Sequence, residues 1–378
     1  MCMYYFQLIM RKYLITTLIL LLTPHHLHAK WQFSANGLAG LYYGITEAKE
    51  ENKYPNRWVV RNDTSLKADY HFNSQHKAGI HASTTIMFRQ DDTNRRGGEY
   101  RFYPYITDSS KLGEFYLGYT YNAAYMLHKG AKDITFLKID DSNATYFLSN
   151  PNWNNGYKST LYATPKSTSI MTDGRAPKFT YITPSSNNSR IGFSYTPDNA
   201  NRRGMVSRYT NYQTKEDGYS FGIQQKWQLD NSTLYFSGGY GIFNETDKEA
   251  SIGLSWEYKN FNIATGFKKA YIDGTKNPIS ITSINSHLPA YFDNYRESNA
   301  WNISLGYNWD TFKTNIAYLN TKSANTRHQD NLILWSNVYS LDKHTELYLT
   351  TSYLNIHGLK PEKDNRSYGI ISGIGWRY

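Results

Sequence analysis

A serine between two glycines is the strongest catalytic motif in the sequence. Gly218-Tyr219-Ser220-Phe221-Gly222 matches the Gly-x-Ser-x-Gly pattern in which hydrolases hold a nucleophilic serine. That chemistry needs a strand, a sharp turn and a helix, which together lift the hydroxyl out of the sheet. Here the motif begins a segment of alternating residues, and no helical pattern follows it. Since no Ser, His and Asp residues are grouped elsewhere, the sequence predicts that the protein is not an enzyme.

Metal-binding chemistry is not indicated either. The histidines are scattered, and none has the spacing of metal ligands on a shared face. The acidic pairs Asp91-Asp92 and Asp140-Asp141 carry the oxygen ligands that Ca²⁺ prefers, but an acidic pair in a loop is usually only solvated. We therefore expect no metal and no cofactor.

The elements that position the polar side chains are predicted to be β-strands. In the segment 301–309, Trp301, Ile303 and Leu305 alternate with Asn302 and Ser304. Successive side chains of a strand point to opposite faces, so such a segment has one apolar and one polar side. Sixteen segments follow this pattern, at 31–45, 58–72, 78–90, 99–107, 112–121, 178–184, 189–196, 219–229, 232–243, 250–258, 261–271, 299–309, 312–320, 331–341, 345–355 and 367–378.

The connections between these segments alternate between short and long. The short ones, such as Asp230–Asn231 and Lys259–Asn260, carry residues that favour tight hairpins. The long ones would all emerge at one end of the sheet, as they do in outer-membrane barrels. An even number of antiparallel strands can also close into a cylinder that leaves no backbone group facing lipid. The sequence therefore predicts an all-β fold, a 16-stranded antiparallel transmembrane β-barrel.

Composition and the first residues agree with export to a membrane. Arg11 and Lys12 precede a short apolar run, and Ala29 ends the segment, so residues 1–29 are expected to be a signal peptide and 30–378 the barrel. The only cysteine, Cys2, lies in that segment. The mean hydropathy of −0.65 is low, yet 16% of the residues are aromatic, which suits a wall with one lipid face and one wet face. The net charge of +10 is spread over many segments, so no nucleic-acid site is expected.

The end of the chain carries the most specific family resemblance. Tyr368, Ile370, Ile374, Trp376 and Tyr378 alternate with small or polar residues, and the segment 190–197 (Arg-Ile-Gly-Phe-Ser-Tyr-Thr-Pro) has a similar character. Together with the strand count and the loop order, they make the chain resemble the general porins of Gram-negative bacteria. This resemblance implies a homotrimer in outer-membrane lipid. It also implies a water-filled channel for the passive diffusion of small hydrophilic solutes and ions.

The resemblance also implies a constriction formed by the third long loop. This loop, 122–177, is exceptionally long, and in the family it folds into the lumen and narrows it. Opposed charges across such a gap would orient dipolar solutes and screen ions. The candidate basic wall is Arg61, Lys67, Arg89 and Arg101, and the candidate loop acids are Asp133, Asp140, Asp141 and Asp173. The alternative is that these acids lie on an external loop. A Pro-Glu-Phe-Gly stretch found in enterobacterial members is missing from this loop.

The inward-facing charges predicted from strand register are more often basic than acidic. The basic set is Arg61, Lys67, Arg89, Arg101, Lys178, Arg190, Lys226, Lys268, Lys313 and Arg377. The acidic set is Asp63, Asp69, Glu99, Glu114, Glu257 and Glu346. This difference indicates a mild preference for anions, which the loop acids could reverse.

Two other functions stay open from the sequence alone. A channel specific for one solute class could bind it through loop aromatics such as Tyr146, Phe147 and Trp153. A surface adhesin or receptor could use the barrel only to display its loops. Conductance in planar bilayers separates both channel hypotheses from the adhesin, because an adhesin carries no current.

Overall fold

The computed structural model describes residues 30–48, 56–72, 76–89, 97–108, 112–135, 139, 167–170, 173, 176–197, 217–243, 247–271, 297–323, 329–357 and 364–377. The predicted signal peptide, residues 1–29, lies outside them. No helix within these ranges is long and apolar enough to cross a membrane.

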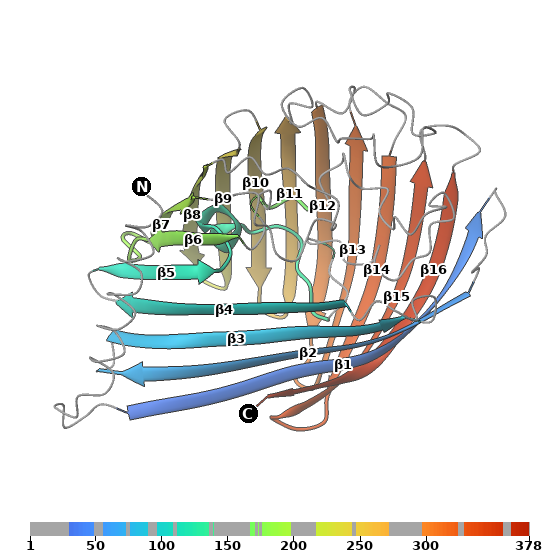
Figure 1. Ribbon diagram of the computed structural model, residues 1–378. Helices are drawn as coiled ribbons and strands as arrows, with labels where there is room; N and C mark the ends of the chain where they lie inside the picture. The colour runs from blue at the N-terminus through green and yellow to red at the C-terminus, as the bar shows by residue number, and fades with distance from the viewer. Residues whose placement is uncertain are drawn as a thin grey trace, which may run out of the picture.

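Sixteen antiparallel strands form one closed barrel, in which each strand pairs with its neighbours in the sequence (Figure 1). The strands are β1 (Lys30–Ala48), β2 (Asn56–His71), β3 (His76–Arg89), β4 (Gly97–Asp108), β5 (Gly113–Tyr119), β6 (Pro177–Ile182), β7 (Ser189–Thr196), β8 (Gly218–Leu229), β9 (Ser232–Phe243), β10 (Asp247–Tyr258), β11 (Phe261–Tyr271), β12 (Glu297–Asn308), β13 (Phe312–Ser323), β14 (Gln329–Ser340), β15 (Thr345–His357) and β16 (Asn365–Arg377). One short helix, α2 (Ala123–Leu127), follows β5. The predicted fold class is therefore confirmed, and the predicted bounds of β7, β9 and β11 agree with the structure.

The barrel closes where the first strand meets the last. β1 pairs with β16 from Asn36 opposite Arg377 to Ala48 opposite Asn365, and its other edge pairs with β2. Each strand thus has two hydrogen-bonded neighbours, so the sheet has no free edge. In lipid, an unpaired backbone group costs several kcal/mol, so closure is what allows this sheet to cross a membrane.

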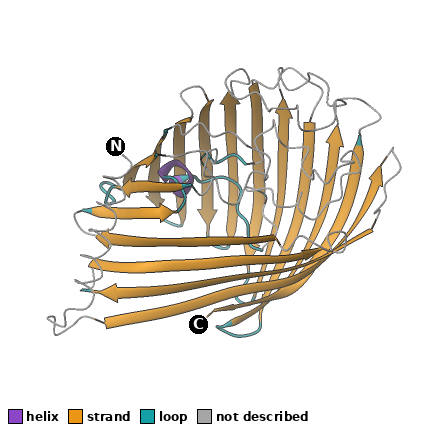
Figure 2. Cartoon of the chain, in the orientation of Figure 1, coloured by secondary structure: helices purple, strands orange, loops and turns teal. Residues whose placement is uncertain are grey.

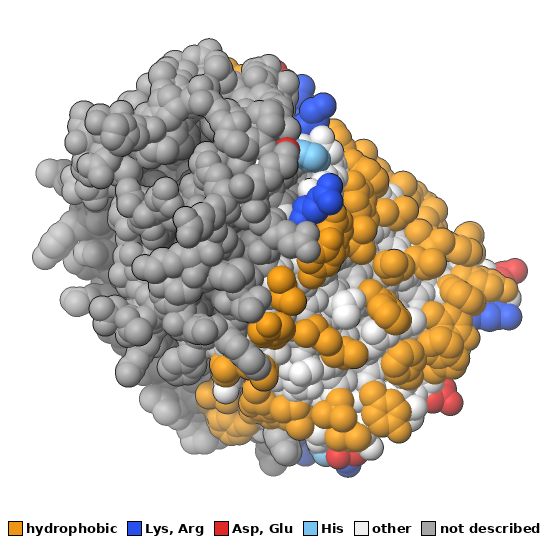
Figure 3. Space-filling model, turned by 90° about the vertical axis from the view of Figure 1, so that its right-hand side faces the viewer, with side chains coloured by type: hydrophobic (Ala, Val, Ile, Leu, Met, Phe, Trp, Pro, Cys, Tyr) orange, Lys and Arg blue, Asp and Glu red, His pale blue; other side chains and the backbone are white. Residues whose placement is uncertain are grey.

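The outer face of the barrel is apolar and the inner face is mostly polar. On β10, Ile252, Leu254 and Trp256 are exposed, whereas Ser251 and Ser255, at alternate positions of the same strand, are buried. Figure 3 shows hydrophobic side chains spread over one side of the molecule, with charged side chains toward its margins. A wall that exposes large hydrophobic residues outward and polar residues inward suits lipid outside and water inside.

Aromatic side chains gather at the end of the barrel that carries the short turns. The rings of Phe261 and Tyr307 lie 4.4 Å apart, those of Tyr307 and Trp309 lie 4.2 Å apart, and those of Trp309 and Phe312 lie 5.4 Å apart. Aromatic rings are favoured at the boundary between membrane and water. This cluster therefore marks the level of one membrane surface.

Candidate functional site: the third loop and the lumen wall

The third loop begins with a helix that is pressed against the inner wall. The side chain of Asn122 caps α2 by accepting a hydrogen bond from the backbone N–H of Tyr125 at 2.8 Å. The small residues Ala123 and Ala124 are buried against β7, β8 and β9, and the N–H of Ala123 donates to Ser194 Oγ at 2.7 Å. In Figure 2 the helix and the loop segments that follow it lie on the inner side of the strands.

Glycines on the inner wall make room for this close approach. A Cβ on Gly222 would lie 2.8 Å from Cα of Ala124, and a Cβ on Gly253 would collide with the carbonyl of Lys129. In both cases the added Cβ would clash with backbone atoms of the loop, which cannot move away by a rotamer change as a side chain can. Glycine in a strand interior often marks such a site. The inner-wall glycines that the third loop approaches closely are Gly192, Gly222, Gly239, Gly253 and Gly266.

After the helix, the loop follows the inner wall from strand to strand. The N–H of Lys129 donates to Ser237 of β9 at 2.9 Å, and the N–H of Lys132 donates to Ser304 of β12 at 2.9 Å. Further along, the hydroxyl of Thr135 lies 2.8 Å from that of Thr350 on β15. Side chains of β9, β12 and β15 therefore provide hydrogen-bond partners for polar groups of the loop, which would otherwise be buried without them.

Part of the inner wall under the loop is apolar, which differs from the predicted polar lining. Leu332, Leu334 and Ile371 point inward from β14 and β16 and are fully buried. Ile134 and Ile139 of the loop pack against the cluster that these residues form. The wall is apolar here because it holds a loop by hydrophobic contact, and only the rest of the wall is available to line a passage.

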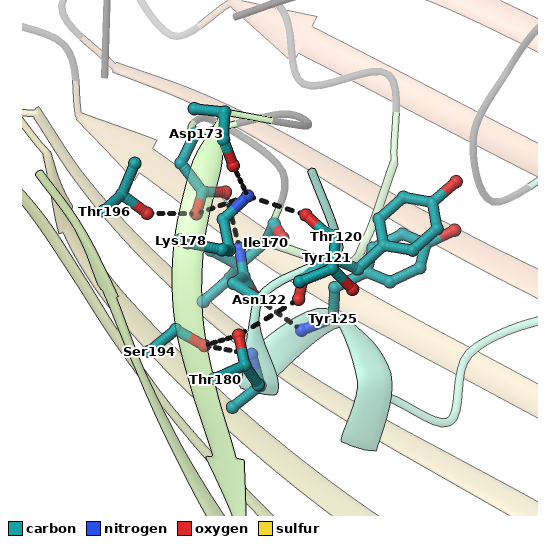
Figure 4. A network of polar contacts seen from close by, with 12 residues as sticks. Thr120, Tyr121, Asn122, Tyr125, Ile170, Asp173, Lys178, Thr180, Ser194 and Thr196 are labelled. Carbon is teal, nitrogen blue, oxygen red and sulfur yellow. Dashed lines mark hydrogen bonds and ion pairs between the residues drawn. The ribbon is translucent and has the colours of Figure 1, made fainter. Parts of the chain in front are cut away.

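A buried ion pair fastens both limbs of the loop to the wall (Figure 4). The Lys178 side chain is 0% exposed and its Nζ lies 3.4 Å from Oδ2 of Asp173, which is 1% exposed. Lys178 also donates to the carbonyls of Thr120, at 2.7 Å, and Ala176, at 2.9 Å. Thr120 belongs to the segment that leaves β5, the outgoing limb of the loop. Asp173 and Ala176 belong to the segment that leads into β6, the returning limb. One ammonium therefore joins the two limbs.

The carboxylate of Asp173 is satisfied on both oxygens. Asn122 Nδ2 donates to Oδ1 at 2.7 Å, and the Thr196 hydroxyl donates to Oδ2 at 3.0 Å. Asn122 also donates to the carbonyl of Ile170 at 3.1 Å, so the residue that caps α2 contacts the returning limb as well. We call Asn122, Asp173, Lys178 and Thr196 the loop anchor.

The predicted loop acids are placed in different environments. Asp173 is buried in the loop anchor, so it holds the loop and does not face an open passage. Asp133 accepts a hydrogen bond from the N–H of Ile139 at 2.5 Å and lies on the loop inside the barrel. Asp140 and Asp141 lie outside the described residues. The loop aromatics Tyr146, Phe147 and Trp153 lie outside them too.

The predicted basic wall is only partly described. Arg61 of β2 points inward and pairs with Asp63 at 2.9 Å. Lys67 of β2 also points inward, is exposed to the lumen, and lies opposite His81 of β3 in the strand register. The backbones of Arg89 and Arg101 lie in β3 and β4, but their side chains are outside the description.

A polar and aromatic strip lies on the wall near Lys67. The ring of His81 makes hydrogen bonds to Ser65 Oγ, at 2.7 Å, and to the hydroxyl of Tyr103. The hydroxyl of Tyr105 donates to Asp69, which also pairs with Lys77 at 3.3 Å. These side chains come from β2, β3 and β4, and they keep this part of the inner surface hydrophilic.

The sequence interpretation missed several charged groups of the lumen. Asp247, Glu249 and Asp330 face inward, but they precede the predicted starts of their strands. On the loop, Lys129 and Lys132 were not singled out among the candidate charges. The described part of the loop therefore presents basic as well as acidic groups.

Lys132 and Lys129 differ in their surroundings. Lys132 pairs with Glu257 of β10. The Nζ of Lys129 instead lies 4.9 Å from the ring centroid of Tyr235, as in a cation–π contact. Burial lowers the pKa of Lys129 below its ordinary value, and the charges of Lys132 and Arg190 lower it further against the opposing effect of Glu257.

No catalytic or metal centre is seen in the part of the chain that the structure describes. The hydroxyl of Ser220, from the Gly-x-Ser-x-Gly motif, points inward and makes no hydrogen bond to a base. The second glycine of that motif is Gly222, which lies directly beneath α2. Within the described ranges, no three His, Cys, Asp or Glu side chains gather as metal ligands would.

Comparisons with solved structures show the same fold. An anion-selective porin from Comamonas acidovorans is similar to this chain with a TM-score of 0.53 and 10% identity, over 93% of this chain and 100% of that one. An OmpF structure from Salmonella typhi, in complex with daunomycin, has a TM-score of 0.56 and 11% identity, over 92% of this chain and 98% of that one. At such low identity, these similarities show the architecture alone.

Comparison of the sequence itself gives the family. No curated protein matches the chain. A family model described as Gram-negative porin matches residues 16–358, which is most of the sequence. The match covers β1 to β15, the third loop and the loop anchor together, so the chain belongs to the Gram-negative porin family.

Proposed function

We propose that this chain forms a water-filled channel for the passive diffusion of small hydrophilic solutes and ions across the outer membrane. The family and the fold point to an outer-membrane channel and not to an enzyme. The observation that carries the proposal is a closed barrel, apolar outside, whose third loop is fixed to one side of the inner wall. A loop whose described residues are held against the wall in this way should narrow the passage, as the family resemblance implies.

Reconstitution into planar bilayers tests this function. We expect stepwise current increases when purified protein is added to a salt solution, and increases in groups of three would support a homotrimer. Liposome swelling should then decrease smoothly as the size of the sugar increases, because a diffusion channel selects by size. Uptake that saturates with one sugar would support a specific channel, and absence of conductance would support an adhesin or receptor.

The pairing of charges supports a mild preference for anions. Six inward-facing strand carboxylates are in ion pairs, namely those of Asp63, Asp69, Glu114, Glu249, Glu257 and Glu346. Within the described part of the chain, Lys67, Lys129 and Lys226 face the lumen without a carboxylate at ion-pair distance. A paired charge has a weak field at a distance, so these three lysines should make the lumen more positive, opposed in part by Asp247 and Asp330, which also face inward.

Replacing Lys67 and Lys226 by Gln should reduce this preference. Two unit charges at contact distance in water interact by about 1 kcal/mol, so each lysine should change the anion-to-cation permeability ratio by a few-fold. Reversal potentials across a KCl gradient measure this ratio directly. Lys322→Gln is the matched control, because Lys322 is exposed on the outward face of β13. A ratio that is unchanged by both substitutions would contradict the assignment, as would cation selectivity of the wild-type channel.

A further inference from the structure

A small cavity lies between the third loop and β10. Its volume is about 220 Å³, and it is lined by residues of the loop segment 128–133, by Tyr125 and by Ser255 of β10. Three of the lining residues, His128, Lys129 and Lys132, are basic, and one, Asp133, is acidic. The carboxylate of Asp133 already accepts a hydrogen bond from the N–H of Ile139. The cavity therefore has a surplus of donors and positive charge over acceptors.

Ser255 gives this cavity an unused hydrogen-bond donor. The residue is 1% exposed, lines the cavity, and its hydroxyl has no hydrogen-bond partner within the described ranges. A buried hydroxyl without a partner is costly, and each such group in a native protein calls for an explanation. An acceptor atom bound in the cavity would satisfy it.

Lys129 gives the cavity a cation that has no counter-ion in the described part of the chain. Among the residues that the structure describes, the partner of its ammonium is the face of the Tyr235 ring, and Glu257, the nearby acid of β10, pairs with Lys132. Burial lowers the pKa of Lys129, and repulsion from Lys132 and Arg190 lowers it further; a bound anion would relieve that repulsion. The backbone of Lys129 is fixed to Ser237 of β9 at 2.9 Å, so the position of the side chain is set by the wall.

We propose that this cavity is a binding station for small oxyanions, in which Lys129 supplies the charge and Ser255 donates a hydrogen bond. Phosphate and carboxylate groups share this chemistry, so the solutes that pause here would be phosphorylated or carboxylated molecules. The inference rests on the proposed channel function, since the cavity lies within the lumen. A solute held briefly on the loop would raise its local concentration in the passage and slow the flow of other anions.

Block of chloride current by inorganic phosphate tests the station. Phosphate should reduce the single-channel chloride current along a saturating curve, and acetate should do so more weakly because it carries less charge. Lys129→Gln should raise the half-blocking phosphate concentration by about tenfold, because glutamine keeps a hydrogen-bond donor but loses the charge that strengthens the bond. Lys129→Arg should retain most of the block, and Ser255→Ala should weaken it by a few-fold.

Lys248→Gln is the matched control, because Lys248 lies on the exposed outward face of β10 and should leave the block unchanged. A channel that conducts chloride but shows no saturating phosphate block would overturn the station and leave the channel function intact. Equal block in wild type and Lys129→Gln would do the same. If no conductance of any ion is seen, the proposed channel function itself fails.

The block should also weaken at alkaline pH. Lys129 is charged below its pKa, which is lowered, so it loses its charge at a lower pH than an ordinary lysine does. The charged and titratable groups that face it are His128, Lys132 and Asp133 of the loop, Arg190 of β7, Tyr235 of β9 and Glu257 of β10. The Lys129→Arg channel should keep its block in the pH range in which the wild-type channel loses it.

Discussion

Lys178→Met should release the third loop from the wall and leave the barrel itself closed. The substitution removes the ammonium that joins Thr120 to Asp173 and leaves the Asp173 carboxylate buried without a counter-ion. Breaking a buried pair by removing one partner typically costs about 3–5 kcal/mol. The barrel has its own closed hydrogen-bond ladder, so this loss should act mainly on the loop. We expect noisier single-channel currents with a larger mean conductance, together with faster proteolysis of the loop.

A rim ion pair offers the control for this experiment. Lys313 pairs with Glu346 at 3.3 Å, but it is 36% exposed, and Glu346 keeps a second partner in Arg377. Lys313→Met should therefore change stability by less than about 1 kcal/mol and leave the current noise unchanged. The double variant Asp173→Asn with Lys178→Met should recover part of the loss, because no uncompensated buried charge remains. Quiet currents in Lys178→Met would show that the loop anchor is dispensable.

Gly222→Val should displace α2 from the inner wall. The new Cβ alone would lie 2.8 Å from Cα of Ala124 and 2.9 Å from the carbonyl oxygen of Ala123. Overpacking of a filled interior costs about 1–3 kcal/mol, and here it falls on a helix that cannot move outward through the strand ladder. The helix must move into the lumen, so we expect a narrower passage and a lower conductance, measured in the same bilayer assay.

Gly238→Val is the matched control for this substitution. Gly238 lies on β9, next to the strand of Gly222, and its side-chain position points to the outer face, where the nearest atom is a methyl of Ile223 at 3.3 Å. A valine there adds apolar surface on the lipid side and should leave conductance unchanged. If both variants conduct as the wild type does, the close approach of α2 to the wall has no influence on the passage.

The sixteen strands could be predicted because lipid and water impose opposite preferences on successive side chains. The alternation of apolar and polar side chains is imposed only within the membrane. It therefore becomes weak where a strand continues past the membrane surface. The starts of β10 and β14 were placed at 250 and 331, whereas the strands begin at Asp247 and Gln329. The acids Asp247, Glu249 and Asp330 were missed for this reason.

Two features of the strand sequences indicate where the third loop lies against the inner wall, and the sequence interpretation did not include them. Glycines at inward positions, such as Gly222 and Gly253, mark the places where the backbone of the loop comes close. The run Leu332-Ile333-Leu334-Trp335 is apolar on both faces, which is typical of a strand that is covered on both sides. The role of Asp173 could not be predicted, because its partner Lys178 faces it only after the two limbs of the loop have come together.

Closure between β1 and β16 has a consequence for how the protein is assembled. The hydroxyl of Tyr348 donates to the carbonyl of Ala39, 309 positions away, beside the seam where β1 and β16 pair. Contacts between such distant segments form slowly, since a long stretch of chain must be ordered first. Until β16 is synthesised and docked, β1 and β15 each offer an unpaired edge to other chains. Misassembly would therefore begin at these two edges if they were not protected until β1 and β16 pair.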